Sequence, residues 1–247
     1  MARVIVPLPD SDFDPTETAV PWHTLTRAGH EVVFATERGA VPACDPLLIR
    51  GVMFGELGAK PEPKSVYAEM VASKELQEPI AWSAIDPAAY DALVLPGGHA
   101  QGMKQYLGSE LLHAKVGAFA ATGKPIAAIC HGVLVLARST DPSTGKSVLH
   151  GRRTTCLPKY MERIAYYITA WKLGRYYRTY DAYVEDEVKA CLARPEDFER
   201  GPRELSARGT DTDDTPAFVV EQANYVSARW PGDAYLFAKK LLTLLRA

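Results

Sequence analysis

A cysteine stands where an apolar run gives way to a helix-like pattern, in the stretch GKPIAAICHGVLVLA (123–137). His131 and Gly132 follow Cys130 directly, and Ala128 precedes it by two residues. A nucleophile at a tight strand-to-helix turn needs small residues two positions to either side, because larger side chains would collide. The following helix favours the reactive thiolate over the thiol. The pattern predicts a catalytic cysteine, although a small buried cysteine without a chemical role fits the motif alone about as well.

A second motif that could bind a reacting group is LPGGHAQGM (95–103), which follows another apolar run. Gly97 and Gly98 allow the backbone to approach a ligand closely, so an amide there could hold a developing oxyanion. In open α/β sheets, ligands bind at the carboxyl ends of the strands, which is where this motif lies. His99 could line the same pocket, although a plain turn with a solvated histidine is the alternative.

The third candidate is Glu17, a carboxylate at the start of the first expected helix. Asp12, Asp14 and Thr16 also suit a first helical turn, so helix capping can account for any single carboxylate here. If the first strand lies beside the fourth, Glu17 comes close to Cys130. A neighbouring thiolate and an apolar wall would raise the pKa of the Glu17 carboxyl. It could then hold a proton and donate it to sulfur or to a substrate oxygen.

The elements that must position these residues are read from hydrophobic runs. Short, continuously apolar runs predict buried parallel strands at 3–8, 31–36, 91–98, 125–130 and, as a fifth, 152–157. Helical patterns alternate with them at 16–28, 111–122, 133–138, 183–193 and 233–246. The stretch 217–228 indicates an antiparallel pair around a Gln-Ala-Asn turn or one long bent strand. The alternation predicts an α/β fold with a mostly parallel sheet and helices on both faces.

Composition and charge are those of an ordinary globular protein: 247 residues, 47% hydrophobic, 23% charged, with a net charge of −2. No linker divides the chain, so one α/β domain (1–247) is expected, with insertions around 47–80 and 159–214. The small net charge predicts no nucleic-acid partner. No apolar stretch approaches the roughly 20 residues of a membrane span, so no membrane is expected. Four scattered cysteines and no signal-peptide pattern predict a reduced, cytoplasmic protein.

No metal site is expected from the spacing of potential ligands. The six histidines show no spacing with cysteine or carboxylate that suggests a ligand set. The chain after residue 155 has no acid until Glu162, so the group that would orient a catalytic histidine is not identified. Glu185 or Asp186 could serve, although a solvated helix face suits both. The aromatic stretch 160–180 covers the pocket, makes an oligomer contact, or belongs to the core.

Three segments, in this order, resemble the ThiJ/PfpI superfamily: ETAVPWHTLTRAGHEVVFATE from residue 17, YDALVLPGGHAQGM from residue 90, and GKPIAAICHGVLVLA from residue 123. The resemblance covers most of the chain. It implies a flavodoxin-like three-layer sandwich related to the class I glutamine amidotransferases. It also implies that Cys130 is the nucleophile, His131 its neighbour and Glu17 its protonated carboxyl partner. Gly98 and the backbone N–H of His131 would form the oxyanion site.

The function implied by this resemblance is a cofactor-independent cysteine enzyme, of glyoxalase III or deglycase type, that acts on small reactive carbonyls. A homodimer is implied as well. Two alternatives stay open. One is a PfpI-type cysteine peptidase or amidase, which needs an oriented histidine. The other is a non-enzymatic redox-sensing or chaperone-like stress protein, in which Cys130 is oxidised.

Overall fold

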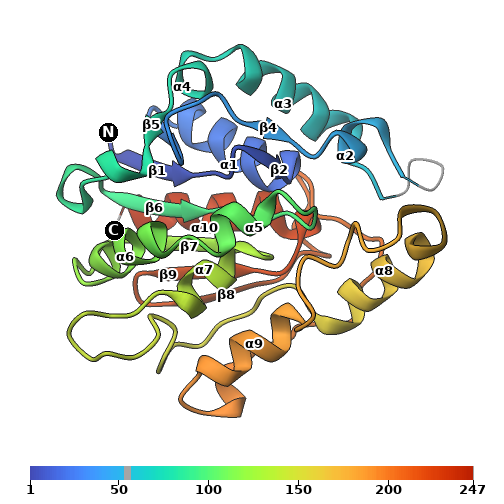
Figure 1. Cartoon of the computed structure of the whole chain (residues 1–247). Coiled ribbons are helices and arrows are strands. Elements are labelled where there is room, and N and C mark those ends of the chain that lie inside the picture. Colours follow the sequence, from blue (N-terminus) through green and yellow to red (C-terminus); the bar gives the residue numbers. More distant parts are fainter. Residues whose placement is uncertain (53–56, 247) are drawn as a thin grey trace.

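The large sheet carries seven strands in the computed structural model, which describes residues 1–52 and 57–246 (Figure 1). Their order is β5-β3-β1-β6-β7-β9-β8, and every neighbouring pair is parallel except β8 with β9. A separate two-stranded sheet pairs β2 with β4. The strands are β1 (Arg3–Pro7), β2 (Ser11–Phe13), β3 (Glu31–Thr36), β4 (Ala43–Cys44), β5 (Ile80–Ala81), β6 (Ala92–Leu95), β7 (Ile126–Ile129), β8 (Val219–Gln222) and β9 (Tyr225–Ala228).

Helices cover both faces of the large sheet, so the expected three-layer α/β sandwich is confirmed. The helices α1 and α10 lie on one face, with α3 packed on α1, and α5, α6 and α7 lie on the other (Figure 1). None of the described helices is long and apolar enough to cross a bilayer. The helices are α1 (Pro15–Arg27), α2 (Pro46–Arg50), α3 (Pro61–Ala72), α4 (Lys74–Gln77), α5 (Met103–Leu107), α6 (Glu110–Ala120), α7 (Gly132–Arg138), α8 (Lys159–Leu173), α9 (Val184–Cys191) and α10 (Ala234–Arg246).

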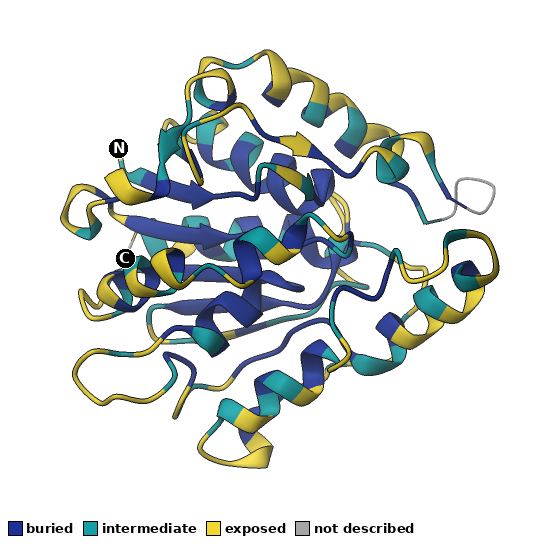
Figure 2. Ribbon diagram, in the orientation of Figure 1, coloured by how far each residue is buried: buried dark blue, intermediate teal, exposed yellow. Residues whose placement is uncertain are grey.

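The central strands are buried on both faces, which explains their continuously apolar sequences. All four residues of β6 (ALVL) and of β7 (IAAI) are buried, and Figure 2 shows these strands in the colour of buried residues. A strand with helices on both faces has no solvent-facing side chains, so its sequence does not alternate. The edge strand β8 mixes buried and exposed residues instead.

Most of the expected elements are present. The four expected parallel strands are β1, β3, β6 and β7, and the stretch 217–228 forms the antiparallel pair β8–β9. The prediction of a fifth strand at 152–157 is wrong, because this segment forms only an isolated bridge between Thr154 and Phe198. The sheet edge that it would join is occupied by β8. The backbone N–H of Thr155 instead donates to the hydroxyl of Ser227 at 2.9 Å.

The two expected insertions contain secondary structure of their own. Residues 47–80 contribute α3, which buries Val66 and Met70, and end in β5, which pairs with β3 at the sheet edge. A strand of two residues is too short to show a hydrophobic pattern, so β5 could not be predicted. The segment 159–214 contains α8 and α9, which extend from one side of the sandwich (Figure 1).

One buried carboxylate, Glu185 on α9, connects separate parts of this second insertion by hydrogen bonds. It accepts hydrogen bonds from the backbone N–H of Lys159 at 2.9 Å, from Lys189 at 2.6 Å, and from Arg200. Burial opposes ionisation, but the hydrogen bonds from Arg200, Lys189 and Lys159 prevail and lower the pKa of Glu185 to about 2. The carboxylate therefore stays ionised in the folded chain at all but very acid pH.

Substitution of Glu185 should show this contribution as a pH-dependent stability. The folded-state pKa lies below the ordinary 4.5, so the stabilisation is complete above pH 4.5 and is lost as the pH falls towards 2. We expect Glu185→Gln to lower the free energy of unfolding at pH 7 by roughly 2 kcal/mol, because charged hydrogen bonds are lost. Urea denaturation at pH 7 and at pH 2.5 measures both values, and the difference should shrink at the lower pH.

Asp186→Asn on the same helix is the matched control. Asp186 forms a half-exposed ion pair with Lys159, and such pairs contribute at most about 1 kcal/mol. Equal losses of stability for the two variants at pH 7 would contradict the proposed anchoring by Glu185. A loss for Glu185→Gln that is the same at pH 7 and at pH 2.5 would contradict its low pKa.

Candidate active site

Cys130 and His131 occupy the turn between β7 and α7. Cys130 has φ +58°, a left-handed conformation that side-chain-bearing residues rarely adopt. Gly132 crosses the end of β6 so closely that a Cβ on it would lie 2.0 Å from the carbonyl oxygen of Leu95. The local geometry is that of a strained strand-to-helix turn, which presents the residue at its apex.

Glu17 reaches this turn from α1, but not for the reason expected. The first strand, β1, lies beside β6 and not beside β7, so the expected neighbour relation is wrong. The contact runs through Gly97, whose N–H donates to Glu17 Oε2 at 2.9 Å. A Cβ on Gly97 would lie 2.8 Å from that same oxygen and 2.7 Å from the backbone nitrogen of His131. Gly97 therefore lies between the carboxyl and the turn, and its N–H is used by Glu17, not left for an oxyanion.

The Glu17 carboxyl is fully buried and retains a proton readily. Burial, followed by repulsion from the Asp14 carboxylate, raises the pKa of Glu17 well above 4.5, against the opposing hydrogen bonds with Cys130 and Gly97. Oxygen Oε1 has no conventional hydrogen-bond partner, and the side chain that hydrogen-bonds this carboxyl is the Cys130 thiol. A protonated carboxyl in this position can donate to sulfur or to a substrate oxygen.

The Cys130 thiol is fully buried, whereas the sequence predicts an accessible sulfur with thiolate character. Burial raises the pKa of Cys130 well above 9.0, and the carboxylates of Glu17 and Asp14 raise it further, against a hydrogen bond from the His131 amide. The dipole of the short helix α7 does not offset this loss of hydration. The resting group is a neutral thiol, which would have to give up its proton to act as a nucleophile.

Two imidazoles lie where they can take this proton. His131 Nδ1 is 3.5 Å and His99 Nε2 is 3.8 Å from the Cys130 sulfur. The centres of the two rings are 4.8 Å apart. Burial lowers the pKa of His99 to about 4 and that of His131 well below 6.5. Both rings are therefore neutral at pH 7, and each can accept a proton.

These three residues also form a set of potential metal ligands that the sequence spacing does not show. The ligand atoms of His99, Cys130 and His131 all lie within 4.8 Å of one another. A thiolate with two imidazoles suits Zn²⁺. His99 comes from the loop after β6 and is 31 residues from Cys130, so only the fold brings it to the turn. The fold thus brings together potential ligands that the sequence spacing does not indicate, and the absence of a metal site stays a prediction.

No carboxylate orients His131 within the described part of the chain. Glu185 binds Lys159, Lys189 and Arg200 as described above. Asp186 pairs with Lys159, and Glu162 pairs with the buried Arg178 at 2.7 Å. The two acids suggested by the sequence, Glu185 and Asp186, and also Glu162 thus stabilise the α8–α9 insertion.

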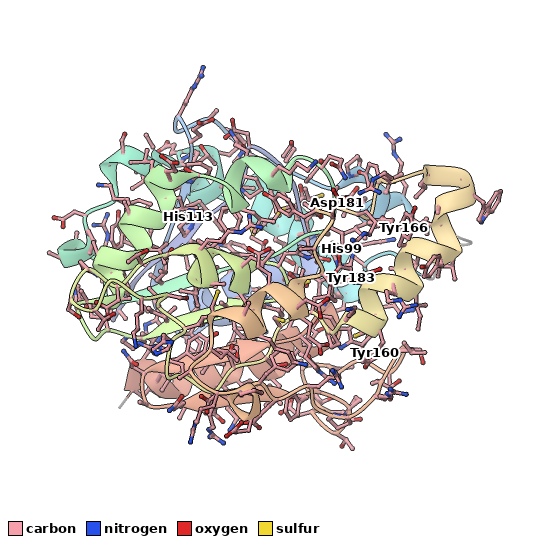
Figure 3. The ribbon with its side chains drawn as sticks, turned by 60° about the horizontal axis from the view of Figure 1, so that its bottom comes forward. His99, His113, Tyr160, Tyr166, Asp181 and Tyr183 are labelled. Carbon is pink, nitrogen blue, oxygen red and sulfur yellow. The ribbon has the colours of Figure 1, made fainter. Side chains whose placement is uncertain are left out.

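The segment 175–179, which follows α8, covers His99, and His99 in turn contacts the Cys130 sulfur. The Tyr177 ring packs edge-on against His99, with 5.8 Å between the centroids. The Thr179 hydroxyl donates to the His99 carbonyl at 2.6 Å, and the Gln101 amide donates to three backbone carbonyls of the segment. Figure 3 shows His99 beside the chain that follows α8. The aromatic stretch therefore contributes a cover, one of the roles that the sequence left open.

A pocket of about 200 Å³ lies on the other side of His99. Its lining is mostly apolar, and one wall comes from α8. The lining residues are Asp14, Leu48, Leu57, His99, Leu157, Met161, Ile164, Ala165, Ile168, Tyr177, Leu205, Arg208, Trp230 and Pro231. Burial raises the pKa of Asp14 to about 6. Sequence reasoning did not identify this pocket, because its walls come from loops and from an insertion.

The family of this chain follows from a comparison with known proteins. The family described as ThiJ/PfpI family-like matches residues 8–202. The chain belongs to this family. A deglycase of Pyrococcus abyssi is 28% identical over 99% of both chains. An uncharacterized protein of Schizosaccharomyces pombe is 27% identical over 98% of this ThiJ/PfpI chain and 84% of its own length.

Solved structures agree on the fold of this ThiJ/PfpI chain. Glyoxalase III from Candida albicans has a TM-score of 0.69 at 20% identity and covers 98% of this chain and 97% of its own. The 24 kDa rapid encystment protein of Francisella tularensis has a TM-score of 0.73 at 18% identity, with 99% of both chains covered. The flavodoxin-like sandwich of the class I glutamine amidotransferase type, implied by the sequence motifs, is confirmed.

The alkylation rate of Cys130 as a function of pH tests the electrostatics of the site. The Glu17 carboxylate is one cause of the raised pKa of Cys130, so we expect Glu17→Gln to shift the alkylation profile to lower pH. Reaction with iodoacetamide, followed by mass spectrometry of the Cys130 peptide, gives this profile. At pH 7 the native thiol should react at least about tenfold more slowly than in urea, where the thiol pKa returns to roughly 8.5.

Glu69→Gln is the control, since Glu69 is an exposed carboxylate on α3. It should leave the profile unchanged. An identical profile for Glu17→Gln and the native chain would show that the carboxyl does not act on the sulfur. Equal rates at pH 7 in the native and unfolded states would contradict the buried, neutral thiol.

Proposed function

We propose that this chain is a cofactor-independent cysteine enzyme that acts on small reactive carbonyls, in particular 2-oxoaldehydes. The observation that carries this proposal is the grouping of four side chains at one turn. Cys130 supplies a nucleophile, Glu17 a carboxyl that retains a proton, and His131 and His99 two neutral bases within 3.8 Å of the sulfur. These groups together suffice for carbonyl addition and for proton transfer.

The relatives support the same chemistry. Deglycases of Pyrococcus abyssi and Thermococcus kodakarensis are 28% and 27% identical over 99% and 95% of this chain. The Protein/nucleic acid deglycase 2 of Escherichia coli is 28% identical over 64% of this chain.

In the first step, the sulfur of Cys130 adds to the aldehyde carbon of R–CO–CHO. A C–S bond forms, the π bond of the carbonyl breaks, and a hemithioacetal results. His131 or His99 takes the thiol proton, and Glu17 gives its proton to the new oxygen. The amides of Gly98 and His131 are the proposed donors to this oxygen while its charge develops.

In the second step, the hydrogen on the carbon that bears sulfur leaves as a proton and is taken by an imidazole. A proton is then returned to the adjacent carbon. The ketone oxygen takes a proton from the imidazole that was protonated in the first step, and the hydroxyl on the sulfur-bearing carbon gives its proton to the Glu17 carboxylate. The former aldehyde carbon is then a thioester carbonyl, and the former ketone is an alcohol. Water hydrolyses the thioester, releases the 2-hydroxy acid and regenerates the thiol. One carbon is oxidised and its neighbour is reduced, so no external oxidant is needed.

The two alternatives have less support at this site. A peptidase or amidase needs a histidine oriented by a partner and a site open to an extended chain, whereas the thiol here is covered by His99 and Tyr177. A redox sensor needs an accessible thiol of low pKa, whereas burial raises the pKa of Cys130. The homodimer and the cytoplasmic location remain predictions, and the four free cysteines suit a reducing compartment.

Turnover by variants tests the proposed chemistry. We expect the native chain to convert methylglyoxal to lactate and Cys130→Ser to form none, because the sulfur makes the covalent bond. Glu17→Gln should lower kcat by about 100-fold or more, the usual contribution of a positioned acid. Cys156→Ser alters another fully buried cysteine and should retain activity. Lactate is measured directly, and circular dichroism confirms that each variant is folded.

Full lactate formation by Cys130→Ser would overturn the proposal. Hydrolysis of amides or peptides without 2-oxoaldehyde turnover would favour the hydrolase alternative. Consumption of one equivalent of peroxide at Cys130, again without turnover, would favour the redox sensor.

A further inference from the structure

The pocket beyond His99 is larger and more apolar than addition to a small aldehyde requires. Met161, Ile164, Ala165 and Ile168 of α8 form one wall, and Leu48 of α2 adds to the lining. The volume is about 200 Å³, and an apolar cavity of roughly 150 Å³ is enough to hold benzene. The single methyl group of methylglyoxal would leave most of this space unfilled.

The exposure of the lining residues also indicates a binding site. Ile164 and Ile168 are 39% and 41% exposed, and Leu205 is 56% exposed. Ile164 and Ile168 are one helical turn apart, so they share a face of α8. Large aliphatic side chains that share one concave volume are typical of a ligand site, whereas apolar residues scattered singly over a surface need no explanation.

Two polar groups of the pocket, His99 and Tyr177, lie on its side towards Cys130. His99 contacts the Cys130 sulfur, and Tyr177 packs on His99. The Tyr177 hydroxyl is buried and has no hydrogen-bond partner, so a ligand oxygen that accepted from it would remove an energetic cost. Asp14 and Arg208 act on each other electrostatically. Because these two opposite charges offset each other, the pocket does not select for an ionic chain.

We propose that this pocket binds the apolar side chain of a 2-oxoaldehyde, a branched or cyclic group of about six carbons. The Cys130 sulfur is buried and does not line the pocket, so the His99 ring between them must turn aside for the aldehyde carbon to reach it. This inference rests on the proposed function and assigns its substrate class. The side chain lies against Ile164 and Ile168, and the Tyr177 hydroxyl donates to the ketone oxygen. The chemical steps at sulfur are those given above, with R an apolar group.

A comparison of three 2-oxoaldehydes tests the proposal in the intact chain. We expect kcat/KM for 4-methyl-2-oxopentanal and for cyclohexylglyoxal to exceed that for methylglyoxal by about tenfold or more. The gain should come from a lower KM. Even one methylene group in an apolar pocket can give this ratio. In Ile164→Gln, kcat/KM for cyclohexylglyoxal should fall at least about tenfold further than that for methylglyoxal. Tyr177→Phe should raise KM for all three.

Tyr167→Gln is the matched control, because Tyr167 lies on the same helix, is 62% exposed and does not line the pocket. It should leave all three kcat/KM values unchanged. An equal effect of Tyr167→Gln and Ile164→Gln would show that α8 acts through stability and not through the pocket, and would overturn the proposal.

Binding of cyclohexyl methyl ketone, which lacks the aldehyde, separates this inference from the proposed function. Equal kcat/KM values for the three aldehydes would overturn the pocket assignment and leave the proposed function standing. No turnover of any aldehyde would overturn the proposed function. In that case, calorimetric binding of the ketone that Ile164→Gln weakens would support an apolar pocket, and an absence of binding would overturn both.

Discussion

The ends of β6 and β7 approach so closely that only glycine fits between them, and the candidate site depends on this approach. A Cβ on Gly132 would meet the Leu95 carbonyl at 2.0 Å, and a Cβ on Gly97 would meet both the Glu17 carboxyl and the His131 amide within 3.0 Å. Because these two glycines have no side chains, the Glu17 carboxyl on α1 can reach the Cys130 thiol at the end of β7. The left-handed backbone at Cys130 is held in place by the same contacts.

Burial, not the helix dipole, sets the protonation state of this site. A helix terminus contributes about 0.3–1 kcal/mol at an exposed group, whereas full burial can shift a pKa by roughly 3–5 units. Cys130 and both histidines therefore rest in their neutral forms at pH 7, and burial favours the protonated form of Glu17. In the proposed reaction, the nucleophile forms by proton transfer between these neighbours. Because neutral forms need no counter-ion, the groups can lie together in a buried site.

The sequence predicted what depends on local patterning. Continuous apolar runs identified the central strands, and the small residues around Cys130 identified the strained turn. What depends on long-range packing could not be read in this way. Glu17 was placed near Cys130 through a strand order that is wrong, and the threonine-rich segment 152–157 has the composition of a strand but lies outside the sheet. His99 and the α8 wall of the pocket reach the site only through the fold.

The loop that follows β6 carries the His99 imidazole, and the same loop holds the segment 175–179, the cover, by hydrogen bonds. His99 faces the sulfur, and its carbonyl accepts from Thr179, while Gln101 binds three carbonyls of the segment 175–179. The cover cannot lift without breaking contacts to the loop that positions this imidazole. The position of the His99 ring and the position of the segment 175–179 are therefore coupled, so a change in the aromatic insertion would also alter the surroundings of the Cys130 sulfur.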